Sequence, residues 1–171
     1  IDEDNIFRAS DITGDVAEGR MLGDLQIDLT SYEWLLSMDL EDAKLEEITK
    51  ASDAQVASGT FGDLRASFKI MGNIDVPGSK FGRGRIVIQD GKMTDSPLTL
   101  SILQLSQLML PVSDSFDYGE IDFTIEADTM RLDDLELTSP TIEFSGKGEM
   151  SLESWELALR LFPKGTIPVV S

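Results

Sequence analysis

The chain has 171 residues and a mass of 18.8 kDa, the size of a single domain that can bury a substantial core. Its 32 acidic residues exceed its 14 basic residues, and the formal charge of −18 would repel nucleic-acid phosphates and anionic lipid headgroups. With no Cys and no His, the chain has no disulfides, no thiol or His-based nucleophile and no ordinary zinc or haem site.

The start of the chain lacks an initiator Met and the basic and apolar segments of a signal peptide. We therefore expect the sequence to be a piece of a longer protein. Because no run of about 20 apolar residues is present, we expect any membrane anchor to lie outside this piece.

The first half of the chain is dominated by alternation of apolar and polar residues, which is typical of half-buried strands. The alternation predicts strands within 24–29, 34–40 and 63–70. Residues 45–51 have helical spacing over about two turns and predict a short helix. Residues 72–82, which include Pro77, predict a long loop inside one domain.

A second, stronger helix signal follows at about 97–110. Ser96 is a good N-cap, Pro97 suits the first helical position, and Pro111 would end the helix. The segment between them is rich in Leu and carries no charge, so we expect this helix to be covered on most sides.

From Gly119 onward the alternation predicts a meander of strands over 121–127, 130–137, 142–150 and 155–161. The breaks between them are short and polar, which favours antiparallel neighbours. The apolar positions slip by one residue between Leu132 and Leu135, which indicates either a bulge or a turn at Asp133-Asp134. Together these elements predict one mostly β domain over residues 1–171. We expect a strongly curved antiparallel sheet, shaped as a groove or half-barrel, with the helix at about 97–110 on its concave face.

Polar motifs give little support for catalysis or metal binding. Gly82-Arg83-Gly84-Arg85 could form a phosphate-binding nest, but no helix N-terminus follows it, so a strand with outward-facing arginines is the better interpretation. Acidic clusters such as Asp133-Asp134-Glu136 could bind calcium, but the chain has no EF-hand or nonapeptide calcium repeat. Paired carboxylates could serve a glycoside hydrolase, yet with 32 acids some pairing is inevitable. We predict no enzyme activity, no catalytic residue, no cofactor and no metal site.

The order of motifs from about 59 to 163 resembles the C-terminal region of AsmA-like envelope proteins. The resemblance rests on the run Gly84-x-Ile86-x-Ile88-x-x-Gly91-x-Met93, on Ser96-Pro97 with the Leu-rich helix, and on the meander that contains Gly146-Lys147-Gly148. It implies a bacterial cell-envelope protein on the periplasmic side, anchored in the inner membrane by a segment outside this chain. Members of this family are similar to bridge-like lipid-transfer proteins, which implies phospholipid transport or outer-membrane biogenesis through an apolar groove.

If such a groove is present, its ligand would be a phospholipid or another molecule with acyl chains. The apolar strand faces and the helix supply the candidate lining residues, which are Trp34, Leu36, Phe68, Ile70, Ile102, Leu105, Met109, Phe123, Ile125, Phe144, Trp155 and Leu157. The alternative is a purely structural β-module whose helix fills the groove. The two readings differ in whether the apolar side chains fill their own volume.

Overall fold

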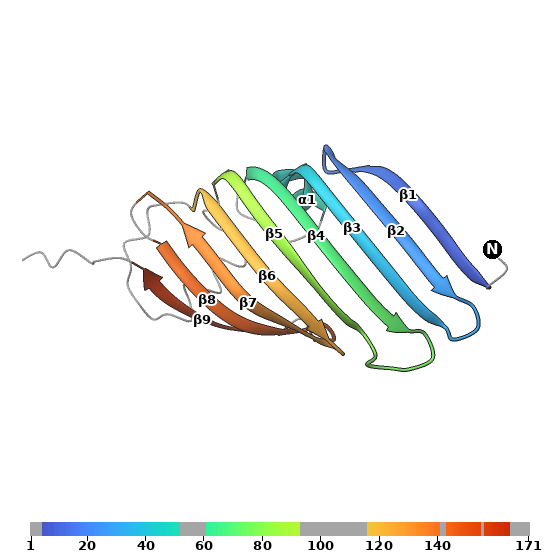
Figure 1. The fold of residues 1–171 in the computed structure, drawn as a ribbon. Helices are drawn as coiled ribbons and strands as arrows, with labels where there is room; N and C mark the ends of the chain where they lie inside the picture. The colour runs from blue at the N-terminus through green and yellow to red at the C-terminus, as the bar shows by residue number, and fades with distance from the viewer. Residues whose placement is uncertain (1–4, 52–60, 93–115, 141–142, 155, 165–171) are drawn as a thin grey trace, which may run out of the picture.

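The computed structural model describes residues 5–51, 61–92, 116–140, 143–154 and 156–164. Within these residues nine strands form one sheet, in which every strand is antiparallel to the next along the chain (Figure 1). Their bounds are β1 Ile6–Val16, β2 Gly19–Asp28, β3 Glu33–Lys44, β4 Phe61–Asn73, β5 Phe81–Lys92, β6 Tyr118–Glu126, β7 Thr129–Thr138, β8 Glu143–Ser151 and β9 Leu157–Lys164. The prediction of a mostly β, antiparallel fold is confirmed.

The order of the strands follows from the connections that the structure describes. Two-residue turns join β1 to β2 and β6 to β7, and such turns can only join antiparallel strands. The loop between β4 and β5 spans residues 74–80, inside the predicted loop at 72–82. At these connections the antiparallel pairing is therefore a local property of the chain.

The sheet is open and is not strongly curled, which corrects the predicted groove or half-barrel. Strands β1 and β9 are the two edges, and each has a single neighbouring strand (Figure 1). Alternation identifies the two faces of a sheet, but closure depends on strand tilt and register, which alternation does not encode. The strand pattern therefore predicted the pairing correctly and the curvature wrongly.

A register irregularity occurs in each odd-numbered strand from β1 to β7. It lies between Ala9 and Ile12 on β1 and between Leu40 and Ala43 on β3. On β5 it lies between Gln89 and Lys92, opposite the start of β4. The fourth lies between Leu132 and Leu135, inside β7. The open question at Asp133-Asp134 is thus answered, since these residues form a bulge and not a turn.

Three of these irregularities contain an aspartate with left-handed backbone. The φ angles of Asp11, Asp42 and Asp90 are 56°, 53° and 49°. Asp and Asn adopt this region more readily than most other non-glycine residues. Part of the acidic character of the chain therefore serves the backbone conformation of its bulges.

The predicted short helix is confirmed as α1, Leu45–Ala51, which lies beside β3 and β4 (Figure 1). Glu46 and Glu47 occupy its first turn and Lys50 its last, which suits the helix dipole. The helix predicted at about 97–110 lies outside the described residues, as does its packing against the sheet.

Candidate functional site

The pairing register assigns every strand residue to one of two faces, because residues directly opposite each other share a face. Leu36 on β3 pairs with Leu25 on β2 and with Ile70 on β4. Ile70 pairs in turn with Gly82 on β5, and Gly82 pairs with Ile125 on β6. One row thus crosses five strands through apolar residues and glycine.

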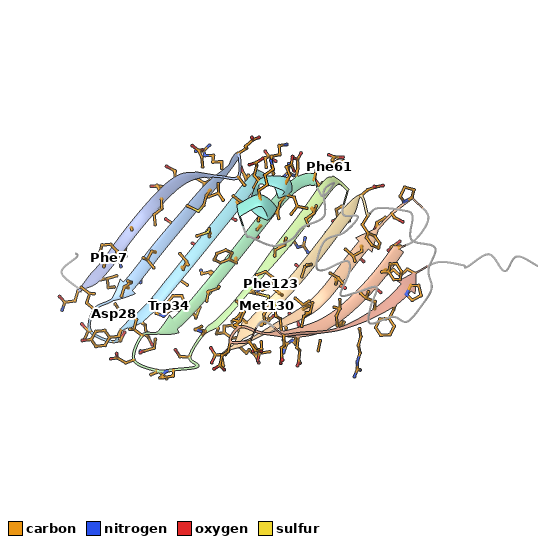
Figure 2. All side chains as sticks on the ribbon, turned by 180° about the vertical axis from the view of Figure 1, so that it is seen from behind. Phe7, Asp28, Trp34, Phe61, Phe123 and Met130 are labelled. Carbon is orange, nitrogen blue, oxygen red and sulfur yellow. The ribbon has the colours of Figure 1, made fainter. Side chains whose placement is uncertain are left out.

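The same is true of every row on this side of the sheet, which we call the apolar face. Each described register position on it holds an apolar side chain or a glycine. Its large side chains are Phe7, Ile12 and Val16 on β1; Met21, Leu25 and Ile27 on β2; Trp34, Leu36, Met38 and Leu40 on β3; Leu64, Phe68 and Ile70 on β4; Ile86 and Ile88 on β5; Ile121, Phe123 and Ile125 on β6; Met130, Leu132, Leu135 and Leu137 on β7; Phe144 and Met150 on β8; and Leu157, Leu159 and Leu161 on β9. Figure 2 labels four of them, Phe7, Trp34, Phe123 and Met130.

Glycines on the apolar face make room for large side chains of the neighbouring strand. A Cβ atom on Gly72 would lie 3.0 Å from Cζ2 of Trp34, its register partner. One on Gly146 would lie 2.6 Å from Cδ2 of Leu161. The large side chains therefore lie over glycine and cover the backbone with hydrocarbon.

Burial on the apolar face is uneven. Two clusters of buried side chains lie toward the C-terminal strands, one around Phe123, Ile125 and Leu132 and the other around Phe116 and Phe144. The rings of Phe116 and Phe144 meet edge to face at 6.0 Å, a favourable arrangement. Leu45 of α1 packs against the second cluster.

The opposite end of the apolar face is more open. The large side chains of β2, β3 and β4 on this face are half-buried, and Phe7, Ile12 and Val16 on β1 are exposed. An apolar ligand would therefore gain most contact over the first four strands, where hydrocarbon remains accessible.

Eight of the predicted lining residues share the apolar face: Trp34, Leu36, Phe68, Ile70, Phe123, Ile125, Phe144 and Leu157. Phe123, Ile125 and Phe144 are buried and the other five are half-buried. The remaining four predicted residues, Ile102, Leu105, Met109 and Trp155, lie outside the described residues.

Sequence reasoning missed the contribution of β1. Phe7 and Ala9 alternate regularly, but the bulge at Ser10-Asp11 shifts the pattern before Ile12 and Val16. The pattern that could have predicted β1 consists of two short alternating stretches separated by one extra residue.

The opposite face of the sheet, which we call the polar face, carries a network of ion pairs. Arg85 lies 2.7 Å from Asp122 and 3.2 Å from Glu120, and its guanidinium lowers the pKa of Asp122. The Thr124 hydroxyl, a hydrogen-bond donor to Asp133, lowers the pKa of that carboxyl, and Arg131 at 2.7 Å adds to the effect. These pairs are largely exposed, so each contributes little to stability.

A shallow hollow of about 530 Å³ opens on the polar face over β3 to β7. Lys69 and Arg83 lie directly opposite each other in it, and neither makes an ion pair among the described residues. Asp122 and Asp133 also line it, but both are held by the partners just described. The hollow is a charged surface on which Asp122 and Asp133 are already engaged in ion pairs.

The Gly82-Arg83-Gly84-Arg85 motif lies inside β5, paired on both sides, with both arginines exposed on the polar face. The strand interpretation of this motif is therefore confirmed. In the part of the chain that the structure describes, no three acidic side chains gather closely enough to hold a metal ion. The same part contains no helix with the length and apolarity needed to cross a membrane.

Comparisons with known protein families, with curated proteins and with solved structures find no match to this chain. The chemistry of the site therefore rests on its own geometry. An open sheet with one apolar and one charged face can hold a flexible apolar ligand on one side while the other side stays in water.

Proposed function

We propose that this chain is a non-enzymatic lipid-handling module whose apolar face holds the acyl chains of phospholipid or of a similar ligand. The observation that carries the proposal is the apolar face itself, which continues across all nine strands and is least covered over β1 to β4. Contiguous exposed apolar surface of this kind is typical of a binding surface.

The dimensions of the first four strands suit an acyl chain. Strand β3 has 12 residues, which at about 3.3 Å per residue gives a length near 40 Å. One leaflet of a bilayer core is about 15 Å thick, so an acyl chain can lie fully extended along this strand. The charged headgroup would then reach the rim of the sheet or water.

The resemblance to AsmA-like proteins supports the cellular setting that we propose. In that setting the chain would lie on the periplasmic side of a bacterial envelope, held by an inner-membrane anchor outside this sequence, and serve phospholipid transport or outer-membrane biogenesis. The acidic surface fits this proposal, because it favours an apolar ligand over nucleic acid or an anionic membrane surface.

The second candidate is a structural β-module without a ligand. The buried clusters around Phe123 and Phe144 favour it, because there the apolar side chains are already covered. The two candidates make opposite predictions for the half-buried side chains of β2 to β4.

Two neighbouring residues of β3 provide a sharp test. Met38 lies on the apolar face and Ser37 on the polar face, and both are half-buried. A photo-crosslinking amino acid placed at either position would be irradiated in the bacterial host, and the purified protein analysed by mass spectrometry. We expect lipid adducts from position 38 and none from position 37. Equal or absent labelling at both positions would favour the structural module.

Charge substitutions at the same two positions give an independent check. Met38→Asp and Ser37→Asp each add one carboxylate to β3, but only the first adds it to the apolar face. Lipid that co-purifies with the protein should be lost with Met38→Asp and kept with Ser37→Asp, because lipid disfavours a charge. Circular dichroism of both variants would show whether the sheet has formed.

A further inference from the structure

The β2–β3 and β4–β5 connections lie at the same end of the sheet (Figure 1). Both connections carry exposed apolar side chains. In the β2–β3 connection Leu29 is 42% exposed and Tyr32 is 46% exposed. In the β4–β5 loop Ile74 and Val76 are 61% and 53% exposed. These are high values for large apolar side chains that lie together at one end of the sheet.

Apolar side chains lie on both faces of the sheet near this end. Ile27 and Trp34 pair with each other on the apolar face. On the other face a row close to the loops, next to the Glu33–Asn73 pair, runs through Leu35, Met71 and Phe81, which pair in register across three strands. This row lies on the polar face, which carries the ion pairs described above. We call Leu29, Tyr32, Leu35, Met71, Ile74, Val76 and Phe81 the apolar tip.

The two connections that form the apolar tip are hydrogen-bonded to each other. The Asn73 side-chain amide donates to the Ser31 carbonyl at 2.7 Å, and the Ile74 amide donates to the Tyr32 carbonyl at 3.0 Å. The backbone N–H of Asn73 donates to the Ser79 hydroxyl at 2.8 Å. The exposed side chains are therefore presented by a joined pair of loops.

We infer that the apolar tip inserts into the surface of an electrically neutral lipid layer. The exposed apolar side chains of this end come from both faces and from the loops, so a partner docking on one face would cover only some of them, whereas a lipid surface can cover them together. The formal charge of −18, with Asp28 and Asp75 in or beside these loops, disfavours an anionic surface.

This inference rests on the proposed function and deepens it. The apolar tip is continuous with the apolar face through Ile27 and Trp34, beside the half-buried strands β2 to β4. A lipid leaving the layer at this tip would meet hydrocarbon along its whole path to the apolar face. The tip would thus be the end at which lipid enters or leaves.

A fluorescent label can locate the contact, because the chain has no Cys and one introduced Cys is a unique attachment point. Val76→Cys places the label at the tip. Phe162→Cys is the matched control. Phe162 is 57% exposed and pairs with Ser145 near the C-terminal end of β9, at the end of the sheet opposite the apolar tip. With phosphatidylcholine vesicles, we expect a blue-shifted, brighter nitrobenzoxadiazole emission from position 76 only. Equal responses, or none at position 76, would overturn the inference.

Vesicle flotation tests how much the apolar tip contributes to the affinity of the protein for lipid. We expect Val76→Asp to weaken binding to phosphatidylcholine vesicles by about tenfold and Phe162→Asp to leave it unchanged, because only the first change puts a charge into lipid. Unchanged binding of Val76→Asp to the vesicles would overturn the inference. A blue shift at position 76 that grows with protein concentration in the absence of vesicles would also overturn it, because that result indicates contact with a second copy of the chain.

Lipid adducts at position 38 without vesicle binding would leave the proposed function standing and reject only the insertion of the apolar tip. Vesicle binding without adducts would reject the acyl-chain site instead.

Discussion

The ring of Phe123 on β6 lies over Gly84, its register partner on β5. A Cβ atom on Gly84 would lie 2.4 Å from Cζ of that ring and 2.6 Å from the Ser67 carbonyl oxygen. Glycine is required here for space, since only a hydrogen atom fits between the ring and the neighbouring strand. Gly84, which belongs to the Gly82-Arg83-Gly84-Arg85 motif considered as a phosphate nest, therefore makes room for a side chain of the apolar face.

Replacing this glycine should therefore destabilise the sheet. We expect Gly84→Ala to lower the free energy of unfolding by about 1–3 kcal/mol, the usual cost of overpacking a core. Urea unfolding followed by circular dichroism measures the change. The matched control is Gly14→Ala on β1, where the added Cβ would meet only the flexible Cε end of Met21, at 3.3 Å. We expect a change within about 0.5 kcal/mol for this control. Equal costs for the two variants would contradict the packing of Phe123 over Gly84.

The turn between β1 and β2 should be open to stabilisation. Ala17 and Glu18 both have positive φ angles, 51° and 65°, in a two-residue turn that favours Asn and Gly. The double variant Ala17→Asn with Glu18→Gly should raise the free energy of unfolding by about 1 kcal/mol, because it removes left-handed strain. For a domain of this size the melting temperature should rise by about 2–4 °C. A lower melting temperature would show that the turn has another conformation.

Acid should weaken the polar face. The pKa of Asp122 is lowered by Arg85, and the pKa of Asp133 is lowered by Thr124 and Arg131. The folded state therefore binds these protons less readily than the unfolded chain does. The resulting stability is present above the ordinary Asp pKa of about 3.9 and is lost as the pH falls below it. We expect the melting temperature of the double variant Asp122→Asn and Asp133→Asn to fall less between about pH 4 and about pH 2 than that of the wild type. Parallel curves would mean that these two groups do not contribute.

Salt should stabilise the chain even though it screens the ion pairs. The 32 acids outnumber the 14 bases, so most carboxylates repel one another, whereas each exposed ion pair contributes little. Raising NaCl from about 20 mM to about 300 mM shortens the Debye length from about 20 Å to about 6 Å. The melting temperature should rise by about 2–4 °C, corresponding to roughly 1 kcal/mol. A decrease would show that the ion pairs of the polar face outweigh the repulsion.

Predictions from the sequence were most successful where the signal is local. The alternation around Leu36, Phe68 and Phe123 identified the side chains that share the apolar face, because side chains in a strand alternate between faces. The same dependence on alternation explains why the strand β1 was missed, because its bulge at Asp11 interrupts the alternation.

Local patterning was enough to predict antiparallel strands with an apolar and a polar side, because short connections and period-two patterning act between near neighbours. The open sheet, the packing of the Phe123 ring over Gly84, and the meeting of Leu35, Met71 and Phe81 at one end became evident from the three-dimensional arrangement. Each of these depends on the register between neighbouring strands. A single bulge changes that register by one residue, and the composition of the strands does not reveal where the bulge will form.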